Sequence, residues 1–165
     1  MHPIAERIKE RFPRAFVGES ESFGEPTLSV RREHIVEVCR ALHDDPEFSF
    51  DHLTDICSVD FPNEPQRFEM VYHFYSIERR KRIRVKARVP EDDCSIDSVT
   101  GIWKGANFLE REVFDMMGIR FNGHPDLRRI LMTEDFDEGY PLRKDFPVEG
   151  KGWRDRFEFL PKDET

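Results

Sequence analysis

Cysteine is scarce in this sequence, and no cysteine stands at the spacing of a metal site. Cys39, Cys57 and Cys94 lie far apart, and no C-x-x-C pair occurs. Because structural zinc and iron–sulfur clusters are usually held by closely spaced cysteines, we expect the chain to bind no metal and no redox cofactor by itself. An odd number of isolated cysteines also fits a reducing compartment better than a disulfide scaffold.

Long apolar runs are missing as well. The longest covers only a few residues, whereas a membrane-spanning helix needs about 20 apolar residues in a row and a secretory signal has an apolar block. We therefore expect a cytoplasmic chain, or one that partners hold to a membrane.

The short motifs of common enzyme classes are absent too. The sequence contains no G-x-G-x-x-G, G-x-x-x-x-G-K-[ST], H-E-x-x-H or G-x-S-x-G, so nucleotide cradling and the commoner hydrolytic sites have no local basis. We therefore name no catalytic residue. The alternative is a hydrolase or transferase that uses His124 with Asp126 or Asp135, but no nucleophile accompanies them, and catalysis needs a defined mutual geometry.

Charge, by contrast, is plentiful. Charged residues make up 36% of the 165 residues, with a formal net charge of −8. This balance favours solubility and gives no overall reason to expect nucleic acid. The length suits one domain with a real core.

Hydrophobic periodicity predicts helices over residues 3–12, 32–45 and 106–117. Short strands are expected at 15–17 and 26–30, separated by a turn around Gly18 and Gly24, and longer strands at 68–76 and 82–89, where apolar and polar residues alternate. Residues 48–59 mix helical and strand signals. These elements predict an α+β fold with two layers, in which a mostly antiparallel sheet is covered by helices.

The segment after Gly118 has no single period. Glycine and proline recur through residues 118–152 and interrupt any regular element, yet the segment is too apolar for a disordered spacer. We predict a core domain at residues 1–118 and an extended, irregular C-terminal arm at residues 119–165 that belongs to the same unit and docks on a partner. In its tail, Trp153, Phe157, Phe159 and Leu160 are expected to dock partly.

Seven basic residues crowd into positions 79–88, a stripe that could grip a phosphate backbone. We interpret it as a solvated or protein-facing surface, because alternation in a half-exposed sheet makes every second residue polar and no stacking aromatics lie among the cations.

The helix at 106–117 places Ala106, Leu109, Val113 and Met116 on one face, and Gly118 ends it. From the usual location of charged residues, we interpret the remaining polar positions as a solvated outer face. These positions are Glu110, Arg111, Glu112 and Asp115. Arg111 and Asp115 can pair on this face, although their order is the weaker one for an ion pair along the helix dipole.

The segment from Glu110 to Pro147 reads EREVFDMMGIRFNGHPDLRRILMTEDFDEGYPLRKDFP. It resembles the signature of the 30 kDa subunit of respiratory complex I, the NADH:quinone oxidoreductase. Met117 stands where members of that family commonly carry phenylalanine, and Gly101 where an acidic residue is usual. The matching positions are Glu110, Arg111, Glu112, Asp115, Gly118, Phe121, Gly123, His124, Pro125, Asp126, Leu127, Arg128, Arg129, Leu131, Glu134, Asp135, Pro141, Leu142, Arg143, Lys144, Asp145 and Pro147.

The resemblance implies a non-catalytic subunit of the peripheral arm of a proton-translocating complex. Such a subunit holds no cofactor, because FMN and the iron–sulfur clusters belong to partner subunits. It packs beside the quinone-site subunit and neighbouring iron–sulfur subunits, binds no nucleic acid, and reaches the cytoplasmic face of the inner membrane only through its partners. The alternative is the equivalent subunit of a membrane-bound hydrogenase or another proton-pumping dehydrogenase.

We expect the interface with these partners to lie in the helix at 106–117 and the arm. Buried apolar anchors and arginines dominate interface energies. The expected interface residues are Arg111, His124, Leu127, Arg128, Arg129, Leu131, Pro141, Leu142, Arg143, Lys144 and Phe146.

Overall fold

The computed structural model describes residues 2–148. Its helices are α1 (Pro3–Arg11), η1 (Arg32–His34), α2 (Ile35–Asp44) and α3 (Ala106–Met117). Its strands are β1 (Phe16–Ser22), β2 (Glu25–Arg31), β3 (His52–Asp60), β4 (Phe68–Ser76), β5 (Lys81–Val89), β6 (Ser95–Asp97) and β7 (Arg120–Asn122).

Five strands form one mixed sheet in the order β1-β2-β5-β4-β3. The β1–β2 hairpin and the β3–β4–β5 meander are antiparallel, and only the central β2–β5 pair is parallel. The predicted α+β class with a mostly antiparallel sheet is confirmed. The parallel pair follows from the long crossover from β2 through α2, β3 and β4 to β5, because parallel neighbours cannot be joined by a tight turn.

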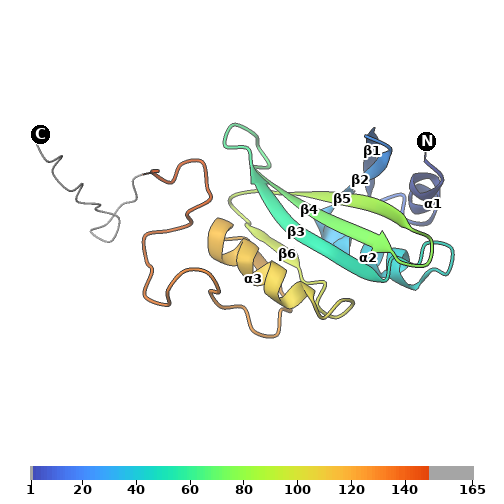
Figure 1. The fold of residues 1–165 in the computed structure, drawn as a ribbon. Helices are drawn as coiled ribbons and strands as arrows, with labels where there is room; N and C mark the ends of the chain where they lie inside the picture. Colours follow the sequence, from blue (N-terminus) through green and yellow to red (C-terminus); the bar gives the residue numbers. More distant parts are fainter. Residues whose placement is uncertain (1, 149–165) are drawn as a thin grey trace, which may run out of the picture.

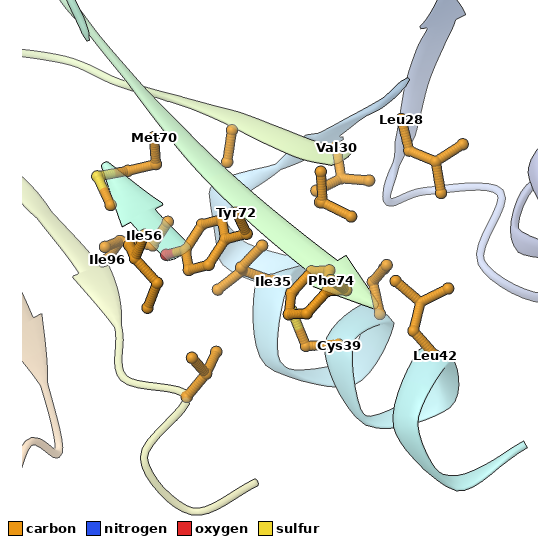
Figure 2. Close-up of a cluster of buried hydrophobic side chains, with 14 of the residues drawn as sticks. Leu28, Val30, Ile35, Cys39, Leu42, Ile56, Met70, Tyr72, Phe74 and Ile96 are labelled. Carbon is orange, nitrogen blue, oxygen red and sulfur yellow. The ribbon is translucent and has the colours of Figure 1, made fainter. Parts of the chain in front are cut away.

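Helices α2 and α3 lie on the same face of the sheet (Figure 1). The alternating apolar residues of β2, β4 and β5 point to this face, since successive side chains of a strand point to opposite sides. Figure 2 shows the resulting core, in which side chains of β2 and β4 face those of α2. The strands contribute Leu28, Val30, Met70, Tyr72 and Phe74, and the helix contributes Ile35, Cys39 and Leu42. Each large apolar side chain buried here contributes about 1.5–3 kcal/mol of transfer free energy.

Some sequence predictions need correction at the strands. The first hairpin is longer than expected, because Gly18 lies within β1 and the turn falls at Phe23 and Gly24, which both have positive φ (54° and 79°). Most of the ambiguous residues 48–59 belong to β3. β6 and β7, which pair in parallel as a separate two-stranded sheet, were not predicted from the sequence.

The prediction of a solvated face on α3 was wrong for three of its four residues. Glu110 and Asp115 are fully buried and Arg111 is 7% exposed, so only Glu112 faces solvent. A carboxylate or guanidinium is buried only where hydrogen bonds replace water. The chain segments that cover this face of α3 supply those bonds.

The arm begins inside the core, since Ile119 and Phe121 are fully or nearly fully buried. Residues 123–148 contain no helix or strand. The predicted partial docking of the tail at Trp153, Phe157, Phe159 and Leu160 lies outside the described residues. Within residues 2–148, no helix combines the length and apolarity needed to cross a bilayer.

Candidate functional site

Asp115 on α3 holds the arm by its backbone. Its Oδ2 accepts hydrogen bonds from the N–H groups of Ile130, Leu131 and Met132 at 3.0, 2.8 and 2.9 Å, while its Oδ1 accepts one from Arg129 at 2.7 Å. Burial alone raises the pKa of Asp115, but the amides of Met132 and Ile130 and the guanidinium of Arg129 outweigh it and lower the pKa. The carboxylate therefore stays ionised and replaces the hydrogen bonds that an irregular segment cannot make with itself.

Arg111 holds the same part of the arm from one helical turn earlier. Its Nε donates to the carbonyl of Arg128 at 3.1 Å and its Nη2 to that of Arg129 at 3.0 Å. The predicted ion pair between Arg111 and Asp115 was therefore wrong, because each side chain binds arm backbone instead. Since residues four apart share one helix face, the two charges form a single clamp: Arg111 takes carbonyls and Asp115 takes amides. We call this the α3 clamp.

A second buried pair holds the arm at Lys144 and Asp145. Asp60, the last residue of β3, accepts two hydrogen bonds from Arg67 at 2.8 and 2.9 Å and one from the Lys144 N–H at 2.7 Å. Arg67 also contacts Asp145 at 3.0 Å and Glu91 at 2.7 Å. The hydrogen bonds from Arg67 lower the pKa of Asp60, as expected for a charge-assisted, bidentate pair.

The C-terminus of α3 is closed by the arm. Gly118 adopts φ 77°, and a side chain added there would displace the ring of Tyr140. The N–H of Leu142 donates to the carbonyl of Met116 at 3.1 Å, and Arg143 Nε donates to that of Met117 at 2.7 Å. The last carbonyls of a helix have no partner within it, so these bonds explain why the chain returns to this point. They also confirm Gly118 as the end of the helix.

Arg143 lies between two aromatic rings. Its guanidinium carbon is 4.8 Å from the centre of the Phe68 ring and 4.6 Å from that of Tyr140. This arrangement stacks the cation on the core domain and on the arm at once.

Glu110 closes the opposite end of the site. Its carboxylate accepts hydrogen bonds from Ser98 Oγ and the Val99 N–H, both at 2.7 Å. Burial raises the pKa of Glu110 to about 7, although these two bonds act in the other direction. Its Oε2 lies 3.9 Å from His124 Nε2, and both side chains are shielded from solvent.

His124 has no nitrogen free for proton transfer. Its Nδ1 accepts the Asp126 N–H at 3.0 Å, so the proton of the neutral ring is assigned to Nε2, which lies 3.1 Å from the carbonyl oxygen of Asn107. The Asp126 carboxylate is paired with Arg128. The ring therefore anchors backbone, and the geometry gives no support to the alternative of a hydrolase or transferase.

The expected interface residues divide into two groups. Arg111, Arg129, Arg143 and the side chain of His124 have partners within this chain, and Leu127 packs against the core. Leu131 and Leu142 are 60% and 56% exposed, and the side chain of Arg128 is 64% exposed. Lys144 is exposed, whereas Pro141 and Phe146 are half-buried. Residues of the first group hold the arm, whereas Leu131, Leu142, Arg128 and Lys144 are open to solvent.

Asp60 and Arg67 were not among the residues predicted from the sequence. A signal existed, because Asp60 ends β3 and Arg67 directly precedes β4, and an antiparallel hairpin brings such positions together. Among residues 2–148, no three His, Cys, Asp or Glu side chains converge as metal ligands would.

In this α+β fold, the buried charges of Asp115, Arg111 and Asp60 bind the backbone of the chain's own arm. The sequence model of the family described as "Respiratory-chain NADH dehydrogenase, 30 Kd subunit" matches residues 28–152, and the chain belongs to this family.

Relatives with known names agree. The chain is 48% identical over 145 residues to the C subunit of NADH-quinone oxidoreductase from Geobacter sulfurreducens, with 87% of this chain and 88% of that protein covered. It is 50% identical over 145 residues to the protein of the same name from a Roseiflexus species, with 88% and 83% covered.

Two solved structures share the fold. A trypsin-resistant fragment (1-134) of Nqo5 matches with a TM-score of 0.64 and 33% identity, over 75% of this chain and 99% of the fragment. A chain of the membrane-bound sulfane sulfur reductase, an archaeal respiratory membrane complex, matches with a TM-score of 0.73 and 27% identity, over 88% of this chain and 84% of that one.

Proposed function

We propose that this chain is a non-catalytic subunit of the peripheral arm of a proton-translocating NADH:quinone oxidoreductase, where it packs beside the quinone-site subunit. The observation that carries the proposal is the clamped arm: α3 fixes its backbone through Asp115 and Arg111, while Leu131 and Leu142 remain exposed. A segment ordered before it binds loses less conformational entropy on binding.

Within such a complex, electrons pass from NADH to quinone through groups on other subunits. We propose that FMN and the iron–sulfur clusters belong to those subunits and that this chain binds none. It would meet the quinone-site subunit and neighbouring iron–sulfur subunits, and reach the cytoplasmic face of the inner membrane only through them. The names of the relatives at 48–50% identity support complex I.

The alternative partner set is that of another respiratory membrane complex. The match at 27% identity to a chain of the sulfane sulfur reductase shows that such complexes contain a chain with this fold. Co-purification distinguishes the two, since only complex I brings subunits with NADH-oxidising flavin activity.

The exposed leucines of the arm provide the test. Changing Leu131 and Leu142 to aspartate is expected to lower recovery of partner subunits in a pull-down by about tenfold or more, because the few residues that dominate an interface each contribute about 2 kcal/mol or more. The folded chain itself should be unaffected, since both side chains face solvent.

The matched control is Ile77→Asp, which changes a similarly exposed side chain (60%) after β4. It should leave recovery unchanged. Equal recovery of the complex by the double variant and the control would show that the exposed leucines of the arm are not docking anchors.

A further inference from the structure

The sheet has a second face that no helix among the described residues covers. Helices α2 and α3 occupy one side (Figure 1), and the alternate residues of the strands point to the other. We call this the open face. On β2, β4 and β5 it carries Thr27, Ser29, Arg31, Glu69, Val71, His73, Tyr75, Arg82, Arg84, Lys86 and Arg88.

Cations outnumber carboxylates on this face. Lys86 and Arg88 share Glu69, at 2.8 and 3.0 Å. In the same way, Arg82 and Arg84 share Glu25, each at 3.6 Å. Arg31 has no ion pair with any residue that the structure describes. The excess of positive charge stands out in a chain whose formal net charge is −8.

Arg31 also lies directly beside another arginine. The parallel register pairs Arg31 with Arg88, and like charges placed side by side on a sheet are destabilising. Both side chains line a groove of about 590 Å³, together with Lys86 and Val17, which is 63% exposed. An arrangement that costs stability in the free chain, next to an exposed apolar residue, is typical of a surface that is completed by a partner.

We propose that the open face binds an acidic segment of a neighbouring polypeptide, whose carboxylates pair with Arg31 and Arg88 and whose apolar residue packs on Val17. The inference rests on the proposed function only in that the neighbour is another subunit of the complex. Glu33 and Glu69 also line the groove, and they would repel the closely spaced phosphates of a nucleic acid. A polypeptide can place its carboxylates apart from them.

The substitution Arg31→Glu separates docking from stability. A carboxylate beside Arg88 relieves the repulsion, so the melting temperature of the purified chain is expected to stay level or rise. The same change places a negative charge where the acidic segment binds, so recovery of the complex should fall about tenfold at physiological ionic strength. The matched control is Arg40→Glu, the same charge reversal on the exposed side of α2.

A second measurement uses Lys86, which lines the groove. Zero-length carbodiimide crosslinking of the assembled wild-type complex should join Lys86 to an aspartate or glutamate of another subunit. Recovery of the complex by the Arg31→Glu chain at the wild-type level, or crosslinks of Lys86 only to Glu69, would overturn the inference while the proposed function stands. Binding of a single-stranded oligonucleotide by the wild-type chain, lost in Arg31→Glu, would also overturn it. A wild-type chain that recovers no partner would overturn the proposed function first.

Discussion

At the scale of single residues, three buried carboxylates hold segments of the chain in place. Asp60, Glu110 and Asp115 are each held by backbone amides, and Asp60 and Asp115 also meet an arginine. A buried charge is tolerated only where such partners replace water. Each carboxylate therefore fixes a segment far from it along the chain.

Asp115→Asn tests the α3 clamp. An amide in place of the carboxylate removes the charge that three N–H groups and Arg129 share, so the free energy of unfolding should fall by about 3 kcal/mol. The peptide bonds that follow Arg128 and Arg129 should also become more accessible to trypsin. Urea unfolding and mass spectrometry of the digest measure the two effects.

Glu112→Gln is the control for this prediction, because Glu112 lies on the same helix and is exposed. It should change stability by no more than about 0.5 kcal/mol. If Asp115→Asn unfolds and is digested like the wild-type chain, the clamp does not hold the arm.

The raised pKa of Glu110 predicts that the stability of the folded chain depends on pH. Its pKa rises from an ordinary 4.5 to about 7 in the folded chain, so between these values the folded state binds more protons than the unfolded state. The contribution of Glu110 to stability is therefore fully present below about pH 4.5 and is lost as the pH rises through 7.

The glutamine variant isolates this effect. Glu110→Gln should match wild type near pH 5 and exceed its stability near pH 8 by roughly 1–3 kcal/mol, as measured by urea unfolding at both pH values. A difference that does not change with pH would mean that Glu110 is already ionised at pH 5.

At the scale of elements, α3 contacts the core with one face and the arm with the other. Its apolar face, with Val113 and Met116, packs on the core, and its polar face receives the arm. The arm then returns to the helix C-terminus, where Leu142 and Arg143 bind the last carbonyls. The helix therefore joins the sheet to a segment that has no helix or strand of its own at residues 123–148.

Deletion of the chain after Asn122 separates these elements. The truncated chain is expected to keep its sheet and helices, because every strand and helix found within residues 2–148 lies upstream and Asp115 and Arg111 would become hydrated once the arm is gone. Assembly should fail, since the arm carries the exposed leucines.

Circular dichroism and pull-down measure the two outcomes, with deletion after Val148 as the control for loss of the tail alone. Outright unfolding of the shorter chain would make the arm part of the domain's own core. Assembly at the wild-type yield would show that docking occurs elsewhere.

At the scale of the whole molecule, charge is distributed by face. Helices and sheet bury an apolar core between them, the open face concentrates cations, and acidic residues dominate the total. The three cysteines are separate: Cys39 lies in the core, where burial raises the pKa of its thiol, and Cys57 and Cys94 are half-buried.

We expect the purified chain to be colourless and free of bound metal, because its separate thiols cannot converge on a cluster. Visible absorption spectra and elemental analysis after chelation check this. Stoichiometric iron or flavin that survives purification would contradict it, and an iron–sulfur protein purified in parallel confirms that the procedure retains clusters.

The sequence by itself determined the elements with strong periodicity and the family. Alternation located β4 and β5 within a residue, and helical spacing located α3 with Gly118 at its end, because these signals are local. The dense pattern from Glu110 to Pro147 identified the family for the same reason.

Only the tertiary structure decided which charges are buried. In the sequence, nothing distinguishes the exposed Glu112 from its charged neighbours Glu110, Arg111 and Asp115. These three are buried because the arm and the loop at residues 98–100 cover them. The parallel pairing of β2 with β5, and of β6 with β7, was likewise beyond local pattern. Such contacts join residues distant in sequence, and their free energy depends on the whole fold rather than on any one segment.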